Sequence, residues 1–426
     1  MREYLLVFLV AAASTYLLTV IAREIALRTG AVAAVRDRDV HAEPIPYLGG
    51  LAMLGGLVAA YLVARELPFL SRSDPFVFRD AAVVLAAGAL ICAVGVLDDI
   101  FDIDALTKLG GQVLAAGLLV YFGVKFYFLP DSGGGQLILD PAQGALMTVV
   151  VVIATVNAVN FVDGLDGLAS GVVGIGACAF FLFCYQLSDI NGVTLATTGA
   201  LLSAALAGAC AGFLPHNFNP ARLFMGDSGS MLIGLVLSAS ALTLTGQFDG
   251  TEVTIGRDGT AAGWVVMFPL LLPVSLLLVP MADLVLAVVR RTRAGRSPFA
   301  PDKQHLHHRL LEIGHSQRRA VFIMWTWAAL LGFGGVVATL YSGPAVWAGL
   351  LVATLLAVGL TFLLPNVRAS VLEPTGADGA VPDAGVPDAA VPDDVVSEGG
   401  APDGAAPEGV EAQDPVPPDG PLPDQS

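Results

Sequence analysis

The sequence predicts an all-α membrane protein that crosses the bilayer many times. The chain has 426 residues, 55% of them hydrophobic, and a mean hydropathy of +0.73. A soluble domain of this length would be more polar. Long apolar runs recur along the chain, and short polar clusters separate them. This alternation is typical of a polytopic membrane protein.

Eleven apolar runs are close to the length that a transmembrane helix needs, which is about 20 residues. The expected spans are 3–22, 48–64, 80–97, 109–127, 144–160, 168–187, 194–214, 229–246, 263–289, 320–341 and 345–365. No signal-peptidase site follows the first run, so we expect that run to stay in the protein as a helix.

The positive charges predict the orientation. Fifteen of the 21 Lys and Arg residues fall on one side of the expected spans, eight of them between 290 and 319. Because cytoplasmic loops carry the excess of Lys and Arg, this side is expected to face the cytoplasm. The N-terminus is then outside and the C-terminus inside, in a plasma (inner) membrane. Nearly all the unusual polar clusters fall on this cytoplasmic side, which predicts a cytoplasmic-face active site.

The last part of the chain differs in composition from the rest. Residues 373–426 hold thirteen acidic residues and no Lys or Arg, so most of the net charge of −16 belongs to them. Repeats such as "VPDAGVPDAAVPDD" cannot bury enough apolar surface to fold. We therefore expect a transmembrane domain over 1–367 and a disordered acidic tail over 368–426. No basic region points to nucleic acid, and no cysteine spacing points to zinc.

Two adjacent acids end the third expected span in "VGVLDDIFDID". Asp98 and Asp99 stand where the helix dipole disfavours negative charge. A solvated helix end is the plain interpretation, but a cation would relieve the repulsion between them. A functional pair is the favoured interpretation, whereas Asp102 and Asp104 are expected to be solvated.

"NFVDGLDG" follows the fifth expected span. Asn160, Asp163 and Asp166 would share one face if the segment were helical. Gly164 would let a ligand approach the backbone. Asp166 alone could cap the next helix, but one cap does not explain two acids and an amide near lipid, where charge is costly.

"HNFNPARLFMGDSGS" leads into the eighth expected span. Asp227 could be a helix N-cap, and a helix N-terminus could also receive a phosphate. Asn217 adds an amide to this segment. Capping and ligand binding explain Asp227 equally well at this point.

"HLHHRL" concentrates three of the six histidines of the chain. A closed zinc set needs more ligands than His305 and His308 could supply from one helix face. The acids elsewhere suit Mg²⁺ better, because it prefers hard oxygen ligands. With Lys303 and Arg309, the histidines resemble an anion clamp.

Carboxylates for a hard cation and cations for phosphate, on one membrane face, suit phosphoryl transfer between a soluble nucleotide and a lipid phosphate. The motifs "HAEPIPYLGG", "VGVLDDIFDID", "NAVNFVDGLDGLASG", "LFMGDSGS" and "SPFAPDKQHLHHRLLEIG" occur in this order over residues 1–365. They resemble the polyprenyl-phosphate N-acetylhexosamine-1-phosphate transferases, which are glycosyltransferase family 4. "HLHHRLL" is similar to the branch that uses UDP-GlcNAc and undecaprenyl or decaprenyl phosphate.

The resemblance implies the transfer of GlcNAc-1-phosphate from UDP-GlcNAc to polyprenyl phosphate, the first step of a cell-envelope glycopolymer. It implies Mg²⁺ as the cofactor, with Mn²⁺ as a substitute, held by Asp227 and by Asn160 as a second ligand. Asp98 and Asp99 would lie at the reaction centre, and His307, His308 and Arg309 would bind the diphosphate or the sugar. The residues that would line the nucleotide pocket are Asp163, Gly164, Asp166, Asn217 and Phe224.

Three other functions stay open on the sequence alone. One is activity like that of the phospho-N-acetylmuramoyl-pentapeptide transferases, and another is a lipid-phosphate hydrolase. An ion-coupled transporter would also place acids in a membrane protein, although no internal repeat is visible. The expected partners are UDP-GlcNAc, polyprenyl phosphate and the bilayer, with a homodimer left open.

Overall fold

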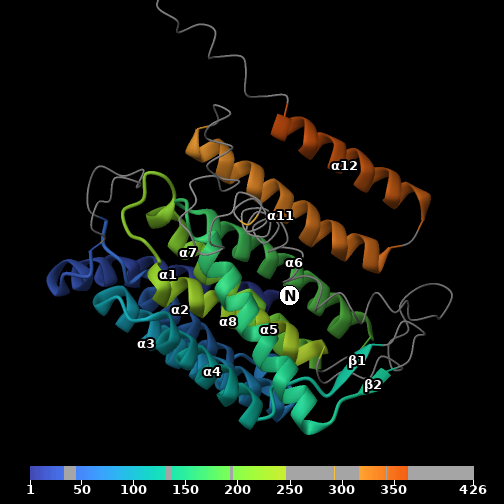
Figure 1. Ribbon diagram of the computed structural model, residues 1–426. Coiled ribbons are helices and arrows are strands. Elements are labelled where there is room, and N and C mark those ends of the chain that lie inside the picture. The colour runs from blue at the N-terminus through green and yellow to red at the C-terminus, as the bar shows by residue number, and fades with distance from the viewer. Residues whose placement is uncertain are drawn as a thin grey trace, which may run out of the picture. The chain divides into compact units, whose positions relative to one another are not determined.

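The computed structural model describes residues 1–32, 45–130, 136–191, 195–245, 292, 316–341 and 343–362. These residues form long helices that lie side by side (Figure 1). The helices are α1 (Arg2–Thr29), α2 (Gly49–Ala64), α3 (Pro75–Phe101), α4 (Ala105–Tyr121), α5 (Pro141–Val162), α6 (Leu168–Asn191), α7 (Leu195–Asn217), α8 (Gly226–Thr245), α11 (Gln317–Leu340) and α12 (Pro344–Phe362). A short 3-10 helix, η1 (Leu70–Arg72), lies between α2 and α3.

The predicted all-α polytopic class is confirmed. Eight of the described helices are long and apolar enough to cross a membrane, and the two shorter apolar helices are α2 and α4. Ten of the eleven expected spans coincide with these helices to within seven residues at each end, the largest difference being at the end of α1. The span expected at 263–289 lies outside the described residues, as do the boundary at 367 and the tail.

Several helices begin at an aspartate that caps them. The Asp74 carboxylate accepts a hydrogen bond from the N–H of Phe76, and Pro75 follows it at the first helical position of α3. Asp104 caps α4 through the N–H groups of Leu106 and Thr107. Such caps satisfy N–H groups that a helix leaves free. The exposed position of Asp104 agrees with its expected solvation.

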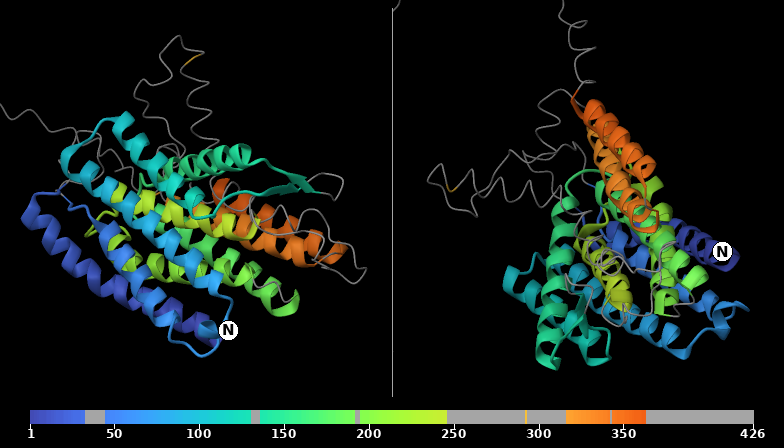
Figure 2. Two further views of the ribbon diagram at one scale, coloured as in Figure 1. Left: turned by 90° about the horizontal axis from the view of Figure 1, so that it is seen from below. Right: turned by 90° about the vertical axis from the view of Figure 1, so that its right-hand side faces the viewer.

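Phe128 and the segment "LPDSGGGQLILDP" that follows it contain the one β-structure with paired strands in the described part of the chain. β1 (Phe128–Pro130) pairs antiparallel with β2 (Gln136–Ile138) between α4 and α5. Figure 2 shows this hairpin near one end of the helices. The sequence predicted only surface turns here, because strands of three residues carry too few side chains to show an alternating pattern.

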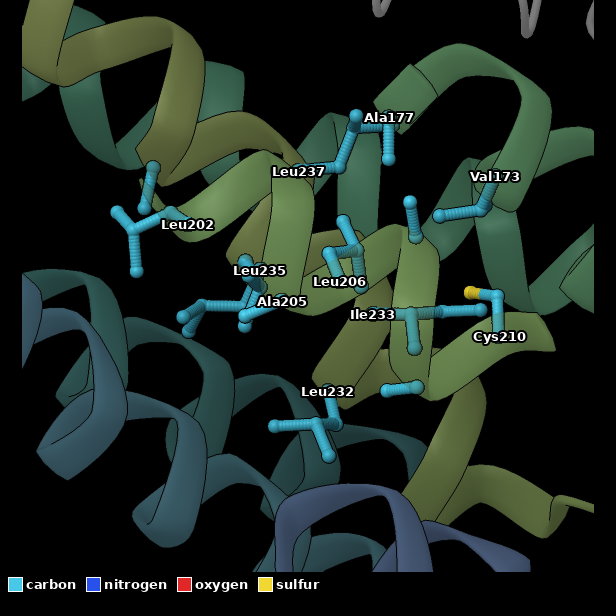
Figure 3. Packing of buried hydrophobic residues seen from close by; sticks show 14 of the residues in the cluster. Val173, Ala177, Leu202, Ala205, Leu206, Cys210, Leu232, Ile233, Leu235 and Leu237 are labelled. Carbon is cyan, nitrogen blue, oxygen red and sulfur yellow. The ribbon is translucent and has the colours of Figure 1, made fainter. Parts of the chain in front are cut away.

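The core lies around α7 and α8. Of the most apolar 18 residues in α8, 94% are buried, against 6% in α12. Side chains of α6, α7 and α8 interleave in this region, with Leu206 and Ile233 among them (Figure 3). α12 packs against α11 and presents most of its apolar surface outward, as expected of a helix that faces lipid.

Small residues let the helices approach α8 closely. A Cβ added at Gly95 of α3 would collide with the backbone of Ser228 on α8, and one added at Gly50 of α2 would meet the same residue. Close approach through small residues is a common way for membrane helices to pack. α2, α3 and the first turn of α8 are thereby fixed against each other, and this first turn contains Asp227.

Candidate active site

Polar residues from four helices meet at one end of the described helices. Asp98 and Asp99 belong to the last turn of α3, Lys108 to the first turn of α4, Asn160 to the last turn of α5 and Asp227 to the first turn of α8. The sequence predicted that the acids would converge, and their hydrogen bonds link them in one group, which we call the acidic cluster. The five residues just named define it.

Asp99 caps α8 from another helix. Its two carboxylate oxygens accept hydrogen bonds from the N–H groups of Asp227, at 2.8 Å, and Ser228, at 3.2 Å. These are N–H groups that the first turn of α8 cannot satisfy internally. A carboxylate at this position also interacts favourably with the helix dipole. Asp99 therefore joins α3 to the start of α8, and it leaves the carboxylate of Asp227 available for other contacts.

Gly226 makes room for this cap. Its φ is +67°, in the left-handed region that favours glycine. A Cβ added there would collide with the carboxylate of Asp99. The glycine in "FMGDSGS" is therefore required both by the backbone conformation and by the approach of Asp99.

Asp227 lies between an amide and an ammonium group. Its Oδ1 accepts a hydrogen bond of 2.6 Å from Nδ2 of Asn160, which also donates to the hydroxyl of Ser230 at 2.8 Å. Its Oδ2 forms an ion pair with Nζ of Lys108, and that ammonium also contacts Oδ2 of Asp98 at 3.0 Å. Asp99, rather than Asp227, therefore provides the side-chain cap of α8.

In the sequence analysis, Lys108 counts only among the positive charges that predict the membrane orientation. In the structure its side chain is 18% exposed and bridges carboxylates of two other helices. A lysine ten residues after paired acids, at the start of the next apolar run, was the available signal. Ser230, three residues beyond Asp227, was also missed, and it lies on the same face of α8.

The predicted common face of Asn160, Asp163 and Asp166 is not formed. α5 ends at Val162, and Asp163 has φ −76° and ψ 46°, outside the helical region. Asn160 therefore faces α8, whereas the two acids lie in the turn that leads to α6. The shared face was expected only if this segment were helical, and α5 instead ends at Val162, close to the expected end of the span at 160. Gly164 and Gly167 follow closely and weaken helical propagation.

Asp163 carries an unusual carboxyl group. Burial raises the pKa of Asp163 from 3.8 to about 7, and the negative charges of Asp99 and Asp166 add to this effect. The residue as a whole remains partly exposed. Asp163 is thus electrostatically connected to the acidic cluster and still accessible to a ligand.

Asp166 and Asn217 hold the loop that leads to α8. Asp166 is 3% exposed, and its Oδ2 accepts hydrogen bonds from Nδ2 of Asn219 and the N–H of Ala221, both at 3.0 Å. Asn217 is 2% exposed; it accepts from the N–H of Gly167 at 3.0 Å and donates to the carbonyl of Leu223. Both predicted pocket residues are therefore engaged in tying the turn before α6 to the segment before α8.

Phe224 and Gly164, like Asp163, are accessible members of the predicted nucleotide pocket. The Phe224 ring is partly exposed and lies 5.9 Å from the ring of Tyr47. Its N–H donates to the carbonyl of Pro46, and its carbonyl accepts from the N–H of Gly49. Gly164 is exposed in the turn beside Asp163. His307, His308 and Arg309 lie outside the described residues.

The donor set of the acidic cluster suits a hard divalent cation. Within the described ranges, no three His, Cys, Asp or Glu side chains are grouped so that they could hold a metal. Mg²⁺ does not require such a group, because it usually keeps several waters and takes one or two carboxylates. Asp98 and Asp227 already share one cation, the Lys108 ammonium, and the side chain of Asn160 adjoins them. Asp227 and Asn160 could therefore hold the metal, as the resemblance implied.

A cavity among the described residues lies elsewhere. It has a volume of about 800 Å³ and is lined by Glu3, Arg72, Asp74 and Ser188, among others. These residues stand at the opposite ends of their helices from the acidic cluster. The cavity is therefore not part of this site.

The fold and the site define a multi-pass membrane protein with an oxygen-rich, ionisable cluster at one end of its helices. The family model described as glycosyl transferase family 4 matches residues 81–245, which include every member of the acidic cluster. The chain belongs to glycosyl transferase family 4, and the resemblance found in its motifs is confirmed.

Similar proteins support this assignment over most of the chain. One is a decaprenyl-phosphate N-acetylglucosaminephosphotransferase of Mycobacterium tuberculosis, 46% identical over 372 residues, or 86% of this chain and 90% of the relative. Another, of Mycolicibacterium smegmatis, has the same description and is 46% identical over 89% of this chain and 91% of its own length. A probable undecaprenyl-phosphate N-acetylglucosaminyl 1-phosphate transferase of Bacillus subtilis is 30% identical over 84% of this chain and 90% of its own length.

Proposed function

We propose that this protein transfers GlcNAc-1-phosphate from UDP-GlcNAc to a polyprenyl phosphate. The products are polyprenyl-diphosphate-GlcNAc and UMP, and the reaction initiates a cell-envelope glycopolymer. The names of the mycobacterial relatives support both the sugar phosphate and the polyprenyl acceptor. Within the molecule, the observation that carries the proposal is the meeting of Asp98, Asn160, Lys108 and Asp227 from four helices.

In this reaction an oxygen of the lipid phosphate attacks the β-phosphorus of UDP-GlcNAc. A new P–O–P bond joins the lipid to the sugar phosphate, and the bond between the β-phosphorus and the bridging oxygen breaks to release UMP. Both reactants are anions, so the site must lower their mutual repulsion. Mg²⁺ bound to Asp227 and Asn160 would supply charge neutralisation for the diphosphate.

Lys108 is the residue of the acidic cluster that can bind the substrates' phosphate oxygens. Its ammonium is partly exposed and has three donors, so it can turn from a carboxylate to a phosphate. Since Asp98 contacts this ammonium, we assign Asp98 a positioning role. A phosphate monoester has a second pKa near about 6 and is mostly dianionic at neutral pH, so it hardly needs a base.

The remaining assignments follow from position and resemblance. Asp163, Gly164 and Phe224 are accessible and would bind the nucleotide, Phe224 by offering a ring face. Asp166 and Asn217 would shape that pocket by holding the loop between them. His307, His308 and Arg309 would bind the diphosphate or the sugar. The acidic cluster would face the cytoplasm, where UDP-GlcNAc is soluble, in the plasma membrane.

The test is the release of UMP by purified protein. We expect UMP from UDP-GlcNAc only when polyprenyl phosphate and Mg²⁺ are both present. Release without the lipid would indicate hydrolysis, and preference for UDP-MurNAc-pentapeptide would indicate the other transferase branch. Absence of product with every UDP-sugar and with both decaprenyl and undecaprenyl phosphate would contradict the proposal.

A further inference from the structure

A second polar layer lies one helical turn deeper than the acidic cluster. Gln112 of α4 and Asn157 of α5 form a reciprocal amide pair. Nδ2 of Asn157 donates to Oε1 of Gln112 at 2.6 Å, and Nε2 of Gln112 donates to Oδ1 of Asn157 at 3.3 Å. Gln112 is 1% exposed, and its amide also contacts the sulfur of Met231 on α8 at 3.6 Å.

The residues of this deeper layer come from three of the helices that form the acidic cluster. Gln112 is four residues after Lys108, Asn157 is three before Asn160, and Met231 is four after Asp227. Residues at these spacings lie on the same face of a helix. The deeper layer therefore stands directly beneath the three side chains that meet in the acidic cluster.

α4 needs such a connection, because it lies at the edge of the described helices. It packs mainly against α3 and α5, and large apolar side chains on its other faces are exposed, including Leu106, Leu114 and Tyr121. The apolar contacts of α4 with α3 and α5 fix its rotation about its own axis and its register along these helices only weakly. Gly111 packs closely on Val94 of α3 and limits the distance between α4 and α3.

We propose that Gln112 and Asn157 are positioning residues that fix the rotation and register of α4 and thereby hold Lys108 between Asp98 and Asp227. The pair has directional hydrogen bonds between the two helices, with Gln112 buried and Asn157 partly exposed. If it is lost, α4 can rotate or slide, and the Lys108 ammonium moves away from the carboxylates. The functional part of this inference depends on the proposed transferase reaction.

The test uses Gln112→Met, Asn157→Leu and the double variant, each of which keeps roughly the side-chain volume. Removing both partners leaves no buried amide unpaired, so the double variant is expected to fold. A fourth variant exchanges the two residues, Gln112→Asn with Asn157→Gln, and keeps an amide on each helix.

Two quantities are measured. The first is the rate at which an amine reagent modifies Lys108 in the folded protein without substrates, followed by mass spectrometry with Lys125 as the internal reference. The second is UMP release, separated into kcat and the KM for UDP-GlcNAc. In the two single and the double apolar variants we expect faster labelling of Lys108 and a kcat about tenfold to hundredfold lower at unchanged KM. The exchanged pair should lie closer to wild type in both.

The matched control is another interhelical polar pair, the hydroxyls of Ser188 and Thr197, which are 3.2 Å apart at the opposite end of α6 and α7. Ser188→Ala with Thr197→Val removes that pair and should change neither quantity. Unchanged Lys108 labelling in the double apolar variant would overturn the inference, whatever its turnover. An exchanged pair no better than the apolar variants would also overturn it. The labelling of Lys108 needs no substrate. It therefore tests the positioning role of Gln112 and Asn157 even if the proposed transferase reaction does not occur.

Discussion

Asp99 shows how one side chain can determine the role of another. By accepting the N–H groups of Asp227 and Ser228, it satisfies the start of α8 and leaves the Asp227 carboxylate to face Asn160 and Lys108. From the sequence, Asp227 could be a cap or a ligand. The distinction required knowing that the end of α3 lies beside the start of α8, which local sequence does not specify.

The first prediction at this scale concerns Asp227→Asn. The variant keeps the shape of the side chain but removes the charge that pairs with Lys108 and would bind Mg²⁺. We expect UMP release to fall by at least about a hundredfold, with folded protein recovered in normal amount. Asp74→Asn is the control, because Asn also caps helices and this position is at the far end of α3. Near-normal turnover of Asp227→Asn would remove the metal assignment.

Lys108→Met tests whether lysine and metal share one carboxylate. Removing the ammonium that pairs with Asp98 and Asp227 should leave more negative charge for a divalent ion. We expect Mn²⁺ to bind about tenfold more tightly in the absence of substrates, or ~1.4 kcal/mol, while UMP release falls. Lys125→Met, just beyond the other end of α4, should change neither. Unchanged or weaker Mn²⁺ binding would show that the two cations do not compete.

Asp163 predicts a dependence of stability on pH. Its pKa is raised to about 7, so the folded protein retains this proton between about pH 4 and pH 7, where the unfolded chain has lost it. The contribution of Asp163 to stability is therefore greatest below pH 4, falls as pH rises to 7, and stays low above. Asp163→Asn removes the charge that causes the loss.

Melting temperatures of wild type and Asp163→Asn at pH 5 and pH 8.5 give the measurement. We expect the variant to be more stable at pH 8.5, by on the order of 1–3 kcal/mol, and the difference to shrink at pH 5. Asp104→Asn should not show this gain, because hydrogen bonds from Thr107 lower the pKa of that exposed carboxyl. A difference independent of pH would contradict the assignment to Asp163.

At the scale of elements, the apolar runs predicted the described helices well. The long runs from 80 to 97 and from 144 to 160 correspond to α3 and α5, each extended by a few residues to an aspartate cap that the sequence also contains. The hairpin of β1 and β2 was missed because its strands are too short for a pattern. The end of α5 at Val162 lies two residues beyond the expected end of that span. The i, i+3 spacing of Asn160 and Asp163 resembles a helical face, but Asp163 lies past the end of the helix.

Gly95 provides a test of how α3 meets α8. An added methyl group would collide with the backbone of Ser228. We expect Gly95→Ala to destabilise the protein by about 1–3 kcal/mol and to reduce turnover, because it pushes Asp98 and Asp99 away from the start of α8. Gly117→Ala on α4 is the control, since nothing lies within 4 Å of its added Cβ. Gly117→Ala should leave the stability of the protein unchanged or raise it slightly, because alanine favours a helix more than glycine does. Equal melting temperatures of the two variants would contradict this packing role.

At the scale of the whole molecule, the sequence predicted the gathering of polar residues at one end of the helices, and the structure brings Asp98, Asp99, Asn160 and Asp227 together there. It could not predict which of them would bond to each other. The buried roles of Asp166 and Asn217 depend on the path of the loop before α8, and they became visible only with the tertiary fold. Lys108 was overlooked because a single lysine at a helix start is typical of any cytoplasmic loop.

The predicted orientation can be tested with single cysteines in intact cells. Thr29 and Ser71 are exposed at opposite ends of the helices, and the four native cysteines are buried or partly buried. A membrane-impermeant thiol reagent should label Ser71→Cys in intact cells and Thr29→Cys only after permeabilisation. The reverse pattern would place the acidic cluster outside the cell.

The cap that α3 supplies to α8 also bears on biogenesis. These two helices are separated by more than a hundred residues, and four other described helices are synthesised between them. A nascent chain that has inserted only its first crossings therefore cannot assemble the acidic cluster. If the proposed reaction takes place there, an incomplete copy would not consume the lipid carrier before its late and early crossings have docked.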